Sequence, residues 1–287
     1  MVLNAGDSQR VAELMRETAA AELLPRFRTL SKEEIRFKRP GDVVTVADVA
    51  SEQRLAVGLA RILPGVPVVG EEAVEKDPGL VDLIGRPGEA CWIVDPLDGT
   101  ANFAAGKDRF AIIICLVQDR SAVAGWILDV PRGRLAVAQK GQGVALDGTP
   151  VHGTPPERPL IGFVGAKARK EFDRQLPPAA RRQLGHMSAS SCAGLEYLDI
   201  LSGGMDFSLY RTTKPWDHAA GTLMLREAGG DAVRFDGQPY EPAQPINAGL
   251  IAAAYPQTLA QVRALFEAVR LPLLAGQPTP YTSRPKY

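Results

Sequence analysis

Apolar residues recur at helical spacing near the start of the chain. They would share one face of a helix: Val11, Leu14, Met15, Ala19 and Leu23. This spacing predicts a helix that is capped by Asp7 or Ser8 and ends near Pro25. Residues 30–42 are polar and basic and predict a loop, and residues 45–63 predict a second helix.

The pattern changes from helical to alternating after residue 65. Six short strands are predicted, over residues 66–70, 90–95, 111–118, 121–128, 134–138 and 143–146. Pro67 marks the first of them as a short strand or an edge strand, because proline has no N–H to donate to a neighbour. Turn sequences such as Asp119-Arg120 and Asp147-Gly148 join or follow several strands, so we expect a mostly antiparallel sheet.

Strands and helices alternate in the second half of the chain, which is typical of an α/β unit. The predicted strands are 160–164, 206–210, 232–235 and 250–254, and the predicted helices are 169–184, 192–201, 216–228 and 256–269. A Gly- and Pro-rich stretch over 149–159 separates the two halves. We therefore expect a domain of helices and antiparallel sheet over 1–155, an α/β domain over 156–270 and a C-terminal tail over 271–287, with 277–287 loosely packed.

Composition narrows the class of protein. The chain has 287 residues, of which 45% are apolar and 23% are charged, as in globular domains. Lys plus Arg and Asp plus Glu both number 33, and this neutral balance argues against an extended nucleic-acid groove or a polybasic membrane anchor. The longest apolar run, 110–117, is far shorter than the roughly 20 residues of a membrane span. The start of the chain does not read as a secretory signal, and the three cysteines form no CxxC pair, so we expect a soluble, cytoplasmic protein.

The sharpest chemical feature is a pair of aspartates that directly follows an apolar strand. Asp95 and Asp98 flank Pro96-Leu97, and the proline forces a turn that can aim both carboxylates at one spot. Two carboxylates held close together repel each other unless a hard cation lies between them. A simple Asp-Gly turn is the alternative explanation for Asp98.

Two further acidic sites strengthen the cation interpretation. Glu71 and Glu72 follow a glycine at the end of a predicted strand, and Asp217 stands at the start of a predicted helix. Taken alone, the glutamates could form a solvated turn and Asp217 could be a helix N-cap. Acidic residues follow two predicted strands and stand at the start of a predicted helix, in a chain without net charge. Together they favour a shared metal site.

Three motifs together resemble the signature of a known family. They are Gly70-Glu71-Glu72, Asp95-Pro96-Leu97-Asp98-Gly99-Thr100 and Trp216-Asp217-His218-Ala219-Ala220-Gly221. The chain resembles, over residues 7–269, the inositol monophosphatase-like family of magnesium-dependent, lithium-sensitive phosphatases. The resemblance implies a layered α-β-α-β-α sandwich, with an antiparallel sheet first and a mixed sheet second. It also implies hydrolysis of a small phosphomonoester.

The resemblance further implies a site for two or three Mg²⁺ ions, with Mn²⁺ as a substitute. Glu71, Asp95 and the backbone carbonyl of Leu97 would hold the first ion. Asp95, Asp98 and Asp217 would hold the second, with Asp95 bridging the two ions. Glu71 would support a third, weaker ion together with water, and Li⁺ would inhibit by displacing a weakly held Mg²⁺. Carboxylate oxygens and retained waters suit Mg²⁺.

The same resemblance assigns the catalytic residues. Thr100 and Glu71 would orient a metal-activated water that attacks phosphorus directly, and Asp48 would accept the hydroxyl proton of Thr100. Thr45 and Asp48 also form the pattern of a capping box, which is the structural alternative for Asp48.

Phosphate and substrate contacts follow from the resemblance by position. The backbone amides that open the helix after Asp98 would bind the phosphate, namely those of Gly99, Thr100 and Ala101. Lys38 matches a family lysine near the metals, with a solvated loop lysine as the alternative. Ser191 and Cys192 would form a wall of the leaving-group pocket.

One departure from the family concerns the substrate. Inositol-specific members carry an acid seven residues before the helix aspartate, where this chain has Tyr210. Arg211 and Lys214 follow it and could favour a second anionic group on the substrate, or be surface charge. The substrate therefore stays open among inositol phosphate, histidinol phosphate, a sugar bisphosphate and a 3′-phosphonucleotide.

A different class of function is a non-catalytic module that binds RNA or a transcription complex, since some members of the family have such partners. The neutral net charge and the full set of acids favour the enzyme instead. We therefore expect a small phosphorylated substrate as the partner and no association with membranes. The resemblance also implies that a homodimer can form.

Overall fold

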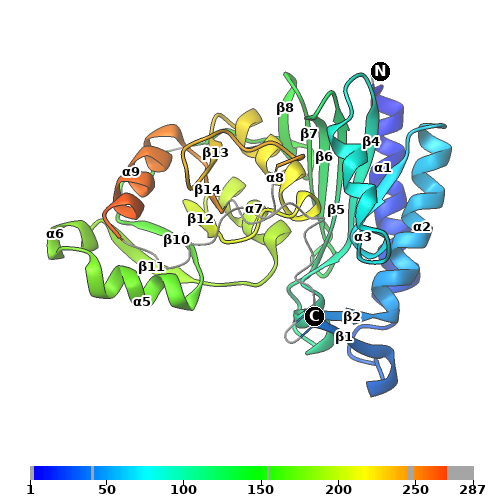
Figure 1. The fold of residues 1–287 in the computed structure, drawn as a ribbon, viewed down its shortest axis with the longest axis horizontal. Coiled ribbons are helices and arrows are strands. Elements are labelled where there is room, and N and C mark those ends of the chain that lie inside the picture. The colour runs from blue at the N-terminus through cyan, green and yellow to red at the C-terminus, as the bar shows by residue number, and fades with distance from the viewer. Residues whose placement is uncertain (1–2, 40–41, 154, 245–248, 270–287) are drawn as a thin grey trace.

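Two β-sheets lie face to face in the molecule, and helices cover and separate them (Figure 1). The computed structural model describes residues 3–39, 42–153, 155–244 and 249–269. From right to left in Figure 1, the layers are helices α1 and α2, a seven-stranded sheet, helices α7 and α8, a five-stranded sheet, and helices α5, α6 and α9. The expected α-β-α-β-α sandwich is therefore confirmed.

The seven-stranded sheet comes first in the chain. Its strands run in the order β3 (Val68–Gly70), β4 (Ala90–Asp98), β5 (Ala111–Gln118), β6 (Ser121–Asp129), β7 (Arg134–Gln139), β8 (Gly143–Leu146) and β9 (Thr149–Pro150). Only the pairing of β3 with β4 is parallel among these strands, so the sheet is mostly antiparallel, as expected. β3 is a short edge strand, which confirms the prediction made from Pro67.

Strand β5 explains why the middle of this sheet is apolar on both faces. Ile112 and Ile114 pack toward α1 and α2, whereas Ile113 and Cys115 pack into the core that contains α7 and α8. A strand covered by helices on both sides has no solvent face and therefore loses the alternation of polar and apolar residues.

The five-stranded sheet is mixed and follows in the second half. Its order is β11 (Leu184–Ser188), β10 (Leu160–Val164), β12 (Phe207–Tyr210), β14 (Leu250–Ala253) and β13 (Asp231–Arg234). β10 pairs in parallel with both β11 and β12, and β14 pairs antiparallel with β12 and β13. A separate hairpin, β1 (Ile35–Arg39) with β2 (Asp42–Thr45), projects beyond the first sheet in Figure 1.

The α-helices connect these strands. They are α1 (Ala5–Thr18), α2 (Val46–Ile62), α3 (Glu71–Lys76), α4 (Thr100–Ala104), α5 (Ala166–Gln175), α6 (Pro178–Arg181), α7 (Ala193–Leu201), α8 (Pro215–Glu227) and α9 (Pro256–Glu267). Shorter helical turns cover Lys32–Glu34 and Pro78–Gly85, and a π-helical turn over Ala19–Leu23 continues α1. α7 and α8 fill the space between the sheets and carry the largest apolar cluster.

The start of α1 differs from the prediction. Asn4 is the N-cap, and its side-chain oxygen accepts the backbone N–H of Asp7 at 2.8 Å. The Asp7 carboxylate in turn accepts the backbone N–H of Asn4 at 3.3 Å, so Asp7 is the second half of a capping box rather than the cap itself. The observed cap therefore lies three residues before Asp7 and four before Ser8, the two predicted caps.

Four strands were not predicted, namely β1, β2, β9 and β11. β1 lies inside the segment 30–42 that we expected to be a loop and is only partly buried, and β2 runs from the last residue of that segment to Thr45. Strand β11 lies where the expected helix 169–184 would end, because Pro177-Pro178 separates α5 from the single turn α6. The expected tail over 271–287 lies outside the described residues. No helix in the described part of the chain has the length and apolar character needed to cross a membrane.

Candidate active site

The acidic residues meet where β3 ends beside β4, its parallel neighbour. Gly70 of β3 is paired with Val94 of β4, so the next residues along the two strands, Glu71 and Asp95, emerge side by side. Helix α8 begins nearby and carries Asp217 in its first turn. The N-cap of α8 is Lys214, which rules out the N-cap explanation of Asp217.

Glu71, Asp95 and Asp217 form a tight cluster. One carboxylate oxygen from each lies within 4.8 Å of the others. Burial raises the pKa of Asp95 well above its ordinary value, and the negative charges of Glu71, Asp98 and Asp217 raise it further. Burial also raises the pKa of Asp217 to about 8, although Lys214 acts to lower it. The cluster therefore holds more negative charge than it can stabilise alone.

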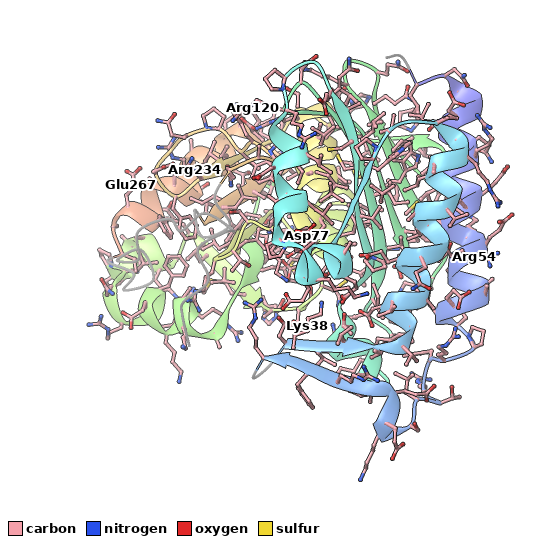
Figure 2. The ribbon with its side chains drawn as sticks, turned by 45° about the vertical axis from the view of Figure 1, so that its right-hand side comes forward. Lys38, Arg54, Asp77, Arg120, Arg234 and Glu267 are labelled. Atoms are coloured by element: carbon pink, nitrogen blue, oxygen red, sulfur yellow. The ribbon has the colours of Figure 1, made fainter. Side chains whose placement is uncertain are left out.

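Two lysines oppose this charge at Glu71. Lys214 donates to Glu71 Oε1 at 3.0 Å, and Lys38 Nζ lies 3.6 Å from the same oxygen and 2.5 Å from Glu72 Oε1. In Figure 2, Lys38 reaches from the hairpin toward the body of the molecule. Burial acts to raise the pKa of Glu71, but the two ammonium groups outweigh it and hold the pKa below its ordinary value.

The donor set suits a hard divalent cation. The three clustered side chains offer carboxylate oxygens only, and the carbonyl of Leu97 follows Asp95 by two residues. Mg²⁺ and Mn²⁺ prefer oxygen ligands of this kind. The raised pKa values of Asp95 and Asp217 show that the ionised cluster needs added positive charge. The residues present therefore fit the expected cofactor.

Asp98 lies apart from the three-acid cluster and faces the start of α7. Its carboxylate accepts the backbone N–H groups of Ala193 at 3.2 Å and Gly194 at 2.6 Å, and the thiol of Cys192 at 3.1 Å. Burial raises the pKa of Asp98, and these three donors act to lower it. Asp98 thus joins the loop after β4 to helix α7, a contact that its place in the sequence motif did not reveal.

Thr100 and Asp48 are in direct contact, as expected. The Thr100 hydroxyl lies 2.8 Å from Asp48 Oδ1 and 2.9 Å from the carbonyl oxygen of Leu97. Asp48 Oδ2 accepts the backbone N–H of Thr45 at 2.8 Å and its hydroxyl at 2.6 Å. The capping box at the start of α2 and the contact with Thr100 therefore coexist on one carboxylate. Burial raises the pKa of Asp48 to about 7, against the effect of these hydrogen bonds.

A left-handed glycine opens the helix that follows Asp98. Gly99 has φ 88° and ψ 31° and is the N-cap of α4, which starts at Thr100. A Cβ atom at Gly99 would lie 2.7 Å from the carbonyl oxygen of Arg109, so both conformation and space require glycine here. The turn leaves the first backbone N–H groups of α4, those of Thr100 and Ala101, without partners inside the helix.

The candidate leaving-group wall, Ser191 and Cys192, and the candidate substrate-selecting residues, Tyr210 and Arg211, lie in two places. Ser191 has φ 55° at the turn before α7, and Cys192 is buried with its thiol directed at Asp98. Tyr210 stacks on Tyr197, with ring centroids 5.7 Å apart. Arg211 is exposed and, among the described residues, makes no hydrogen bond or ion pair. It lines a groove of about 230 Å³ at the start of α5 together with Leu209 and Phe235.

Two buried polar residues beside the site were missed. Glu52 Oε2 accepts the backbone N–H of Glu72 at 2.8 Å and so supports the start of α3. Glu52 stands one helical turn after Asp48. This spacing is the feature of the sequence from which its place beside Asp48 could have been predicted. The Asn102 side chain donates to the carbonyls of Arg109 at 3.0 Å and Ser190 at 2.9 Å, which ties α4 to the turn before α7.

The chain is similar in sequence to proteins of one family. A model of the inositol monophosphatase family matches residues 7–270. The inositol-1-monophosphatase of Bacillus subtilis (strain 168) is 30% identical to this chain over 207 residues, which cover 70% of this chain and 76% of that protein. The Nus factor SuhB of Escherichia coli (strain K12) is 29% identical over 219 residues, which cover 74% of this chain and 79% of that protein.

A solved structure has the same architecture. The Thermotoga maritima IMPase superimposes with a TM-score of 0.73, and the alignment covers 89% of this chain and 96% of that one. The two sequences are 20% identical, so this likeness concerns the fold alone.

Proposed function

The chain belongs to the inositol monophosphatase family, and from this premise we propose that it hydrolyses a small phosphomonoester with Mg²⁺ as its cofactor. The family is one of metal-dependent phosphatases. The observation that carries the proposal is the cluster of Glu71, Asp95 and Asp217 beside the hydrogen-bonded pair of Thr100 and Asp48. The first group can hold cations, and the second can orient a water molecule.

Five residues are proposed to hold two or three Mg²⁺ ions. Asp95, at the centre of the acidic set, would bridge two ions, with Glu71 and the Leu97 carbonyl on one side and Asp98 and Asp217 on the other. Asp98 Oδ2 accepts two hydrogen bonds and Oδ1 accepts one, so Oδ1 keeps a lone pair for this purpose, because each carboxylate oxygen has about two. When bound, Mg²⁺ supplies charge that neutralises the phosphate and lowers the pKa of water.

The proposed reaction is a direct displacement by water. Thr100 accepts a hydrogen bond from the attacking water while it donates its own proton to Asp48. Glu71 would orient the same water. As the new bond from the water oxygen to phosphorus forms, the bond from phosphorus to the leaving alcohol oxygen breaks; the water gives up one proton and the leaving oxygen takes up one, through solvent, so that the products are inorganic phosphate and the alcohol. The amides of Gly99, Thr100 and Ala101 would bind the phosphate oxygens, since backbone N–H groups at a helix start favour anions.

The substrate class stays broader than inositol phosphate. Tyr210 stands where inositol-specific members have an acid, and its ring contacts His218, with centroids 4.5 Å apart, instead of offering a carboxylate. Arg211 lies next to it and is exposed. We therefore propose that a substrate with a second anionic group, such as a sugar bisphosphate or a 3′-phosphonucleotide, is hydrolysed at least as well as inositol phosphate.

A second candidate is a module that binds RNA or a transcription complex. The similarity to Nus factor SuhB of Escherichia coli supports it, because that name denotes a transcription factor. The two functions do not exclude each other, because a phosphatase can also bind RNA or a transcription complex. Separate measurements of phosphatase activity and of RNA binding can therefore distinguish them. Retention of RNA binding by a variant that has lost all phosphatase activity would support this candidate.

The test is phosphate release from a panel of phosphomonoesters. The panel contains inositol 1-phosphate, histidinol phosphate, fructose 1,6-bisphosphate and a 3′,5′-bisphosphonucleotide, each with Mg²⁺, with Mn²⁺ and with excess chelator. We expect release from at least one compound with either metal, none with chelator, and inhibition by Li⁺. Full activity in excess chelator, or no release from any compound with Mg²⁺, would contradict the proposal.

A further inference from the structure

Lys214 is placed to act on the acidic cluster from within the same helix start. It is the N-cap of α8, three residues before Asp217. Its ammonium donates to Glu71 Oε1 at 3.0 Å and also lies 5.6 Å from the centre of the Trp216 ring. Burial acts to lower the pKa of Lys214, but the charges of Glu71 and Asp217 raise the pKa overall. The side chain is therefore protonated and places a positive charge beside the cluster.

Lys38 differs from Lys214 in a way that separates their roles. Lys38 has its own partner in Glu72, at 2.5 Å, and its side chain is only 7% exposed. Lys214 has a side chain that is 30% exposed, and its hydrogen bond to Glu71 is the one it makes among the described residues. Lys38 is thus enclosed, whereas Lys214 has room to leave Glu71 toward solvent.

We infer that Lys214 is a tethered cation that competes with a divalent ion for Glu71. The inference rests on the proposed function, since it takes Glu71 as a metal ligand. A divalent ion at a carboxylate oxygen would lie about 2.1 Å from it. An ammonium at 3.0 Å from the same oxygen would then face two positive charges at close range, so it must withdraw. Metal binding at Glu71 is accordingly an exchange of an ammonium group for a metal ion.

Because a metal ion has to replace its ammonium group at Glu71, Lys214 lowers the affinity of the site for metal. It acts through Glu71 and is therefore a positioning residue. Removal of its charge frees Glu71 Oε1 without altering any carboxylate. Partly exposed ion pairs contribute up to about 1 kcal/mol, so we expect Lys214→Met to bind Mn²⁺ about three- to fivefold more tightly than the parent protein. Lys214→Gln, which keeps a polar side chain, should do the same.

Direct Mn²⁺ titration, followed by the electron paramagnetic resonance of free Mn²⁺, tests the inference without any turnover. Lys140→Met is the matched control, because it removes one positive charge from an exposed lysine in the turn after β7 and should leave Mn²⁺ affinity unchanged. A second comparison uses Glu71→Gln, in which Asp95 and Asp217 still provide ligands. In the Glu71→Gln background, Lys214→Met should change the Mn²⁺ affinity by less than about half of the change that it causes in the parent protein. The reason is that the carboxylate for which Lys214 competes is no longer present.

The outcomes separate this inference from the proposed function. Equal Mn²⁺ affinity in Lys214→Met, Lys214→Gln and the parent would overturn the inference alone. An equally large gain in the Glu71→Gln background would also overturn it, because the effect would then be one of general charge. Absence of Mn²⁺ binding by the parent protein would overturn both the inference and the proposed metal site.

Discussion

Asp48 divides its two carboxylate oxygens between two threonines. Thr45 donates twice to Oδ2, and Thr100 lies 2.8 Å from Oδ1. The capping box therefore fixes the carboxylate in the orientation that Thr100 needs. The Thr100 hydroxyl has one proton and two acceptors within reach, Asp48 and the Leu97 carbonyl. If the Leu97 carbonyl holds a metal, Asp48 is the acceptor that remains.

Substitutions of Thr100 test the hydrogen bonds between its hydroxyl, the attacking water and Asp48. Thr100→Ser keeps the hydroxyl and should retain much of the rate. Thr100→Val keeps the shape but cannot pass hydrogen bonds between water and Asp48. It should lower kcat by about 10²–10⁴-fold, the usual contribution of acid–base assistance. Mn²⁺ affinity should change little in either variant, and a Val variant with the parent rate would exclude the proposed role.

The pH dependence should report on Asp48. Burial raises the pKa of Asp48 to about 7. Only the ionised carboxylate of Asp48 can act as a charged acceptor for the hydroxyl proton of Thr100. At saturating Mg²⁺, log kcat should therefore fall as the pH decreases below about 7 and level off above it. A rate that stays constant down to pH 5 would contradict the requirement for an ionised Asp48.

At the scale of elements, the parallel pairing of β3 with β4 determines which acids meet. One residue beyond the paired positions Gly70 and Val94, the chain leaves β3 at Glu71, whereas Asp95 stays in β4 and pairs with Ile113 of β5. Helix α2 then supports β3 from the side, where Glu52 accepts the backbone N–H of Glu72. A Cβ atom at Gly70 would lie 2.2 Å from Glu52 Oε2, so this glycine makes room for the carboxylate.

Loss of the Glu52 acceptor should weaken both the fold and the metal site. Glu52→Leu leaves the buried N–H of Glu72 without a partner, which should cost about 1–3 kcal/mol in the free energy of unfolding. Glu52→Gln keeps an acceptor oxygen and should be close to the parent protein. Urea unfolding measures the first effect, and Mn²⁺ titration shows whether Glu71 is displaced. Equal stability of the Leu variant and the parent would show that the contact is unimportant.

Most elements could be predicted because their apolar patterns were long and their ends were marked by Gly or Pro. The hairpin β1–β2 could not, because the ribbon is short and lies outside the core, and its one apolar face, with Ile35, Phe37 and Val43, stays partly or fully exposed between charged residues. Strand β11 contains Gly185 and His186, which resemble the end of a helix as much as a strand. Such short elements are fixed by their neighbours rather than by local preference.

The part of the candidate site that lies within the three sequence motifs could be predicted. The acids Glu71, Asp95 and Asp217 come together as their spacing and the family resemblance indicated. The contacts of Asp98 with α7 could not be predicted, because they join residues nearly one hundred positions apart. The hydrogen bond from Lys214 to Glu71 spans 143 positions and has no local pattern. Contacts of this type depend on how the two sheets are stacked.

At the scale of the whole molecule, the candidate site lies where the first sheet meets helix α8. The start of α3 supplies Glu71, β4 supplies Asp95, and α8, which lies between the sheets, supplies Asp217. Asn102 and Asp98 join the same edge to the turn before α7. The stacking of the sheets therefore determines whether the acids are close enough to share a cation.

Phosphate release by Asp95→Asn tests the central claim most directly. Asn keeps an oxygen that can accept the Leu97 N–H, which Asp95 accepts at 3.0 Å, but it removes the charge at the centre of the cluster. Because Asp95 is buried among like charges, thermal unfolding should stay the same or shift upward. At saturating Mg²⁺, phosphate release should fall by at least about 10²–10³-fold. A folded Asp95→Asn protein that releases phosphate at the parent rate would contradict the account.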